Sequence, residues 1–172
     1  MAQHIELNPV SHMTIGTVGE PGQRVFYLQG SRDPHLITLV LEKHQAAILV
    51  ESLVGLLHDL EVSQQIKPSG SQDDFFAMDT RLREPVEPLF RVGNLGLGYS
   101  EETSRLVVVA YELVEEGEEP NVVSFWASAD QVRALVPHAE AVIKSGRPLC
   151  GNCGRAIDKE GHFCPNRNGH LH

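Results

Sequence analysis

Cysteine is scarce in this sequence, and its few copies gather at one end. Among 172 residues there are three cysteines, Cys150, Cys153 and Cys164. An odd number of clustered cysteines does not suit a disulfide framework and is more typical of metal binding in a reducing compartment. The scarcity of cysteine therefore directs attention to the C-terminal segment.

Long hydrophobic runs and a targeting signal are missing. The longest apolar run, Leu106 to Tyr111, is too short for a transmembrane helix, which needs about 20 apolar residues. The opening residues MAQHIELNPVSH have neither the positive region nor the apolar stretch of a secretory signal. We therefore expect a cytoplasmic protein without a membrane-spanning segment.

Positive charge is in short supply over most of the chain. Residues 1–143 carry nine Lys and Arg against 21 Asp and Glu, whereas residues 144–172 carry five against two. An acidic body repels phosphate backbones and anionic membranes, so a contact with nucleic acid would fall to the tail. Weak nucleic-acid binding by the tail is one hypothesis, and packing of the basic tail against the acidic body is the alternative.

The first half of the chain is predicted to form three strands followed by a helix. Runs rich in β-branched and aromatic residues predict strands over 13–19, 24–30 and 36–42, because turn residues separate them. Apolar residues spaced three and four apart then predict a helix over 44–60.

The second half repeats this order. Three strand-like runs are followed by a helix that begins at Ala129, for which Ser128 and Gln131 predict a capping box. Pro137 should kink or divide this helix, because proline removes a backbone hydrogen bond. The three strand-like runs occupy 90–100, 104–115 and 121–128.

The two halves are joined by a segment whose apolar residues follow neither the helical nor the strand period. Residues 61–89 are polar and contain Lys67-Pro68-Ser69-Gly70-Ser71, so a mobile linker is expected there.

A match between the halves supports a repeat. A shift of 86 residues places Gln45 on Gln131, and a shift of 77 places Gly16 on Gly93. The sequence thus predicts an α+β fold, in which a tandem β-β-β-α repeat forms one pseudo-twofold body over 1–146. The halves of that body span about 13–60 and 90–146.

The tail, residues 147–172, carries the most specific motif. It contains a C-x2-C pair, then a third cysteine after ten intervening residues, and then a histidine after five more. Three thiolates and one imidazole complete a tetrahedral zinc site with no open position, which is a structural rather than a catalytic arrangement. The predicted ligands of this zinc-ribbon-like knuckle are Cys150, Cys153, Cys164 and His170.

The fourth ligand of the predicted site has competitors. His162 lies two residues before Cys164, and His172 is the last residue. The spacing and the turn formed by Asn168-Gly169 favour His170. Three free thiols in an unfolded tail are the alternative to a metal site.

Several segments resemble a known family. They are GTVGEPGQRVFYLQG at 16–30, VLEKHQ at 40–45, and the ending GRPLCGNCG…GHFCPNRNGH. Together they resemble an uncharacterised, mainly actinobacterial domain-of-unknown-function family over nearly the whole chain. The family's first knuckle typically reads Cys-Pro-x-Cys, and Gly151 stands at the proline position here.

The resemblance implies no enzymatic activity, but it suggests a protein partner. Genes of the family tend to occur beside those for a histidine-phosphatase-like protein and a protein distantly similar to phosphatidylinositol kinases. A phosphatase-like or kinase-like protein encoded nearby is therefore an implied partner.

Three functional hypotheses follow. The favoured one is a noncatalytic adaptor whose zinc-bearing tail docks another protein. The second is an enzyme or binding protein for a small phosphorylated or nucleotide-like metabolite in a cleft between the halves, with Arg24, Arg32 or Arg91 as anion contacts. The third, nucleic-acid binding by the tail, has Phe163 as its only aromatic platform.

Overall fold

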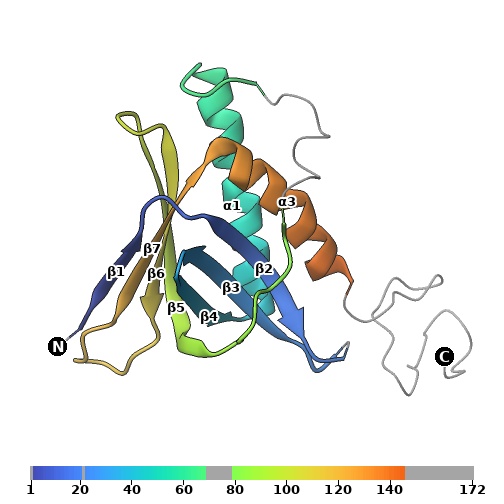
Figure 1. The fold of residues 1–172 in the computed structure, drawn as a ribbon, viewed down its shortest axis with the longest axis vertical. Helices are drawn as coiled ribbons and strands as arrows, with labels where there is room; N and C mark the ends of the chain where they lie inside the picture. The colour runs from blue at the N-terminus through green and yellow to red at the C-terminus, as the bar shows by residue number, and fades with distance from the viewer. Residues whose placement is uncertain (1, 21, 69–78, 146–172) are drawn as a thin grey trace, which may run out of the picture.

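The computed structural model describes residues 2–20, 22–68 and 79–145, and this part of the chain is an α+β fold. Seven strands and two helices are assigned there (Figure 1). In chain order they are β1 (His4–Leu7), β2 (His12–Val18), β3 (Val25–Arg32), β4 (His35–Leu41), α1 (Lys43–Val62), β5 (Pro88–Ser100), β6 (Arg105–Glu112), β7 (Val122–Ser128) and α3 (Ala129–Lys144).

All seven strands belong to one mixed sheet. Their order is β1-β7-β6-β5-β4-β3-β2, and only the β1–β7 and β4–β5 pairs are parallel. The six predicted strands and both predicted helices are present, with ends within a few residues of those expected. Strand β1 was not predicted, because its alternation of polar and apolar residues extends over only four residues, which is too short a signal.

The two edge strands of the sheet are joined by only four residues. Along this connection the N–H of Val10 donates to the carbonyl of Trp126 in β7, and the N–H of Ser11 donates to the carbonyl of Ser31 in β3. The sheet must therefore curve until its two edges approach each other, as Figure 1 shows.

Strand β5 makes a similar transition within a single element. Its first residues pair with β4, where Phe90 lies opposite Leu39, and its later residues pair with β6. The register shifts between Val92 and Asn94, at a bulge beside Gly93. β5 thus changes its pairing partner from β4 to β6 beside this bulge. The chain makes a similar change between β1, which pairs with β7, and β2, which pairs with β3.

The strand registers correct one detail of the predicted repeat. Strands β3 and β6 are both eight residues long, so their first residues can be matched. Gly16 lies opposite Tyr27 in the first hairpin, and Gly98 lies opposite Val107 in the second. Matching the first residues of β3 and β6 therefore places Gly16 on Gly98 instead of Gly93, and the repeat itself stays a prediction.

In each helix the third residue is a glutamine whose side chain bonds to the backbone of the residue just before the helix. In α3 the predicted capping box is confirmed: Gln131 accepts from the N–H of Ser128 at 2.9 Å, and Ser128 accepts from the N–H of Gln131 at 3.1 Å. In α1 the side chain of Gln45 accepts from the N–H of Glu42 at 2.8 Å.

Pro137 does not divide the second helix. Helix α3 runs continuously from Ala129 to Lys144, so the alternative that Pro137 divides it into two pieces was wrong. Pro137 lies on the exposed side of the helix. Water can satisfy the carbonyl freed by the missing bond on that side, which limits the cost of the proline.

The chain contains two series of three strands and a helix, the first from β2 to α1 and the second from β5 to α3. One hydrophobic core serves both series. The ring of Phe125 in β7 packs so closely over Gly30 in β3 that a Cβ at residue 30 would overlap it. Ile15 and Leu28 from the first series and Leu106 from the second are buried in the same cluster. Because the first-series strands and the second-series strands face this cluster together, neither has a separate core.

Candidate functional site

The residues of the predicted zinc site lie outside the described part of the chain. This applies to Cys150, Cys153, Cys164 and His170, and to the alternative ligands His162 and His172. Within residues 2–20, 22–68 and 79–145, no group of three or more His, Cys, Asp or Glu side chains is placed to hold a metal ion.

The three arginines proposed as anion contacts do not converge. Arg24 precedes β3 and donates to the Ser145 hydroxyl at 2.8 Å, whereas Arg32 is the last residue of the same strand. Arg91 lies on β5 and forms an ion pair with Glu42 at 2.9 Å. These residues therefore do not form one anion site.

A polar face of the sheet contains most of the buried polar side chains. In β2, β3 and β4 the residues that point away from the core are hydrophilic where apolar residues would be expected in a buried layer. These buried polar residues are His12, Thr14, Gln29, Ser31 and Thr38. In the strand register His12 lies opposite Ser31, Thr14 opposite Gln29, and Gln29 opposite Thr38.

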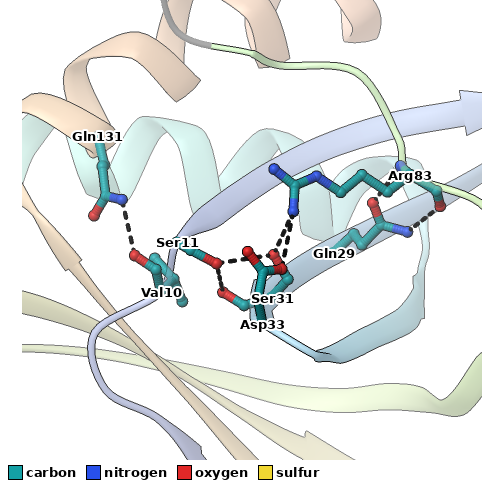
Figure 2. Close-up of polar contacts among 7 residues, drawn as sticks. All are labelled: Val10, Ser11, Gln29, Ser31, Asp33, Arg83 and Gln131. Atoms are coloured by element: carbon teal, nitrogen blue, oxygen red, sulfur yellow. Dashed lines mark hydrogen bonds and ion pairs between the residues drawn. The ribbon is translucent and has the colours of Figure 1, made fainter.

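Residues 79–83 lie against this face and are held by its side chains. The Gln29 amide accepts from the N–H of Arg83 at 2.7 Å and donates to its carbonyl at 2.9 Å (Figure 2). The Thr14 hydroxyl donates to the carbonyl of Thr80, and Leu82 covers Gly16. The expected linker thus ends in a docked segment.

A pocket of about 240 Å³ opens where this segment meets β2 and α3. Its polar lining includes His12, Arg83 and Asp79, and helix α3 contributes Ala134 and Leu135. Because β2 belongs to the first series of elements and α3 to the second, the pocket lies between the two predicted halves.

His12 is the unusual residue of this pocket. It is 4% exposed, and neither ring nitrogen has a hydrogen-bond partner of ordinary geometry among the described residues. Burial and the Arg83 guanidinium lower the pKa of His12, although Asp79, the backbone of Arg81 and Asp33 oppose this. A neutral imidazole at physiological pH can offer one N–H donor and one acceptor nitrogen to a ligand.

Arg83 stands beside His12 with part of its side chain in solvent. Its Nη1 donates to the Ser31 hydroxyl at 3.1 Å and to Asp33 Oδ1 at 3.4 Å (Figure 2). Ser31 is held in turn by Ser11, whose hydroxyl donates to the Ser31 carbonyl at 3.0 Å. The position of the Arg83 guanidinium therefore depends on Ser31 in β3, which Ser11 holds in place.

Comparison with family models gives one match over most of the chain. Residues 5–164 match the family described as protein of unknown function (DUF3090). The chain belongs to the DUF3090 family. No curated protein matches this DUF3090 chain. No solved structure matches it either.

The DUF3090 match spans more than the described body. It includes all three cysteines and His162 but ends before His170. The family resemblance seen in the sequence is thus confirmed at the level of a domain of unknown function. Neither helix in the described part of this DUF3090 chain is long and apolar enough to cross a membrane.

Sequence reasoning missed the pocket residues of this DUF3090 protein. His12 and Arg83 belong to no motif, and Arg83 falls in the segment expected to be a linker. A usable signal was present in β2, where His12 and Thr14 alternate with Met13 and Ile15. Polar residues alternating in neighbouring strands indicate a second face of the sheet.

Proposed function

We propose that this DUF3090 protein is a noncatalytic adaptor whose tail, residues 147–172, holds one structural zinc ion and docks a protein partner. The observation that carries the proposal is the spacing of Cys150, Cys153 and Cys164 with a following histidine, which suits a closed tetrahedral site. A small segment with few large apolar residues gains most of its folding free energy from such a metal.

The fourth ligand is proposed to be His170, with His162 as the alternative. His170 has the spacing and the preceding Asn168-Gly169 turn in its favour. His162 lies within the family match and His170 beyond it. Action in the cytoplasm is part of the proposal, because a reducing compartment keeps the thiols available as ligands.

A zinc-dependent capture experiment tests the adaptor proposal. The full chain, the ligand variant Cys164→Ser and the matched non-ligand variant Asn152→Ser are used as baits against native cytosol. We expect one protein, a phosphatase-like or kinase-like product of a neighbouring gene, to be retained by wild type and Asn152→Ser only. Equal retention by Cys164→Ser would contradict docking through the metal-bound tail.

The body that carries this tail is proposed to be a tandem β-β-β-α repeat with pseudo-twofold symmetry. Support comes from one contact made twice: Gln45 donates to the carbonyl of Val92 at 3.1 Å, and Gln131 donates to the carbonyl of Val10 at 2.9 Å. Each glutamine thus joins the start of its helix to a segment where the chain changes partners in the sheet: Val92 in β5, and Val10 in the connection between β1 and β2.

A second candidate function is small-molecule binding between the halves. The observation in its favour is the buried His12 without a partner of ordinary hydrogen-bond geometry among the described residues, in a pocket formed by β2, residues 79–83 and α3. A panel of small phosphorylated and carboxylated metabolites, screened by thermal shift of the full chain, tests it. If no compound in the panel raises the melting temperature, this function is wrong.

A further inference from the structure

We propose that the pocket beside His12 binds a small monoanionic carboxylic acid, with Arg83 facing the carboxylate and His12 supplying a second polar contact. This inference rests on the second candidate function, small-molecule binding between the halves. It replaces the three arginines expected from the sequence with one that lines the pocket.

The first argument is the state of His12. Leaving a polar group buried without a hydrogen bond costs about 1–3 kcal/mol. Neither ring nitrogen of His12 has a partner of ordinary hydrogen-bond geometry within the described part of the chain, although a neighbouring serine and threonine line the same pocket. A ligand that accepts one hydrogen bond from this imidazole would remove part of the cost.

The second argument is the way Arg83 is held. Gln29 fixes the backbone of residue 83 through two hydrogen bonds, so the side chain is free of that task. The hydrogen bonds found for the guanidinium among described residues use Nη1, and the longer of them, 3.4 Å, goes to Asp33, which is 74% exposed. An incoming carboxylate can therefore compete for the planar donor face of the guanidinium.

Charge in and around the pocket favours a single negative charge on the ligand. Asp79 lines the pocket and is paired with Arg81 at 3.2 Å, and Asp33 stands next to Arg83. Helix α3 adds no titratable side chain to the lining, so Arg83 is the only fixed positive charge there among the described residues. A dianion would meet more repulsion than one cation offsets, whereas a monoanion would not.

Size and polarity narrow the ligand further. A volume of about 240 Å³ lies below the range of about 300–1,000 Å³ usual for drug-sized ligands, so a nucleotide does not suit it. Met13, Ala134 and Leu135 also line the pocket. These apolar side chains suit a short hydrocarbon chain attached to the carboxylate.

Binding of butyrate to the full chain tests the inference directly. Nuclear magnetic resonance titration would follow the His12 ring signals, identified by their loss in His12→Asn, while butyrate or inorganic phosphate is added. Arg83→Gln is the test variant. Arg91→Gln is its matched control, because Arg91 carries the same charge, is half exposed and does not line the pocket.

We expect butyrate to bind wild type and Arg91→Gln with equal affinity, and Arg83→Gln at least about tenfold more weakly. The pKa of His12 should rise on butyrate binding, because a negative charge nearby favours the imidazolium. Equal butyrate affinity in Arg83→Gln, or no binding to wild type, would overturn the inference.

Two outcomes separate this inference from the function on which it rests. If inorganic phosphate binds more tightly than butyrate and needs Arg83, the carboxylate assignment is wrong and small-molecule binding stands. If butyrate, phosphate and the whole metabolite panel leave the His12 signals and the melting temperature unchanged, both are wrong.

Discussion

A buried histidine, His12, and a half-buried one, His138, link the stability of the fold to pH. Burial is the main cause that lowers the pKa of His12 and of His138 below 6.5. The unfolded chain therefore takes up protons near pH 6.5, while the folded chain takes them up at lower pH. The stability from these groups is complete above pH 6.5 and declines as the pH falls toward their folded-state pKa values.

The prediction for His12 is a weaker pH dependence in His12→Asn. Asparagine keeps a polar side chain at residue 12 and has no group that titrates in this pH range. Urea unfolding midpoints at about pH 7.5 and 5.5 should differ less in the variant than in wild type. Identical differences would mean that His12 is not held neutral by the fold, since the other histidines are common to both proteins.

Gln131 supports a second prediction about single residues. It accepts from the N–H of Ser128 and donates to the carbonyl of Val10, so it joins α3 to the start of β2. Gln131→Ala should lower the free energy of unfolding by about 1–2 kcal/mol. The control is Gln23→Ala at an exposed turn position, which should change stability by less than about 0.5 kcal/mol. Equal effects in chemical denaturation would count against the role of the joining contact.

The S-x-x-Q pattern at 128–131 was enough to predict this cap, because the pattern itself describes the bonds. The bond from Gln131 to Val10 was not predictable in the same way. It joins residues 121 positions apart, and only the curvature of the sheet brings them together.

Among the elements, residues 79–83 provide the clearest prediction. Gln29→Met removes both bonds to the backbone of Arg83 while keeping the volume, so it leaves an N–H and a carbonyl without their partner. A loss of about 1–3 kcal/mol is expected. Amide hydrogen exchange at residues 79–83 should become about tenfold faster or more.

The control for this segment is Arg83→Gln, which keeps the backbone bonds to Gln29. Exchange at residues 79–83 should remain slow in that variant. If exchange accelerates equally in both variants, the Arg83 side chain holds the segment as much as the Gln29 amide does, and the proposal that Gln29 is its anchor is wrong.

Most elements were predictable because their apolar periodicity is local. The helix expected over 44–60 is observed as Lys43–Val62, and the strand expected over 121–128 is Val122–Ser128. Strand β1 and the docking of residues 79–83 were missed because distant strands determine both. β1 exists by pairing with β7, and residues 79–83 are held by side chains of β2 and β3.

For the molecule as a whole, the contact between Gly30 and Phe125 joins the two series of elements. A methyl group at residue 30 would overlap the Phe125 ring, so Gly30→Ala should destabilise the protein by about 1–3 kcal/mol. Adding Phe125→Leu should recover part of that loss, because it makes space on the other side of the contact. Strictly additive effects in the double variant would contradict a shared core at this point.

Gly55 is the matched glycine for this test. It lies inside α1, and a Cβ added there would meet no atom of another described segment within 4 Å. Gly55→Ala should stabilise the protein by about 0.5–1 kcal/mol, because alanine favours the helix. A single cooperative unfolding transition is expected in every one of these variants.

The shared core was predictable in outline, since a three-stranded sheet with one helix cannot hide its apolar face alone. The order of the strands was not predictable, because the parallel pairs β1–β7 and β4–β5 join segments far apart in the sequence. The predicted metal ligands remain a prediction, because they lie outside the described residues.

The metal content of the full chain tests the central proposal most directly. Native mass spectrometry of wild type, Cys164→Ser and Asn152→Ser, each purified without added metal, would count the bound zinc ions. The account predicts one zinc ion per chain in wild type and in Asn152→Ser, and its loss in Cys164→Ser. Wild-type protein without zinc, or Cys164→Ser with a full complement, would contradict it.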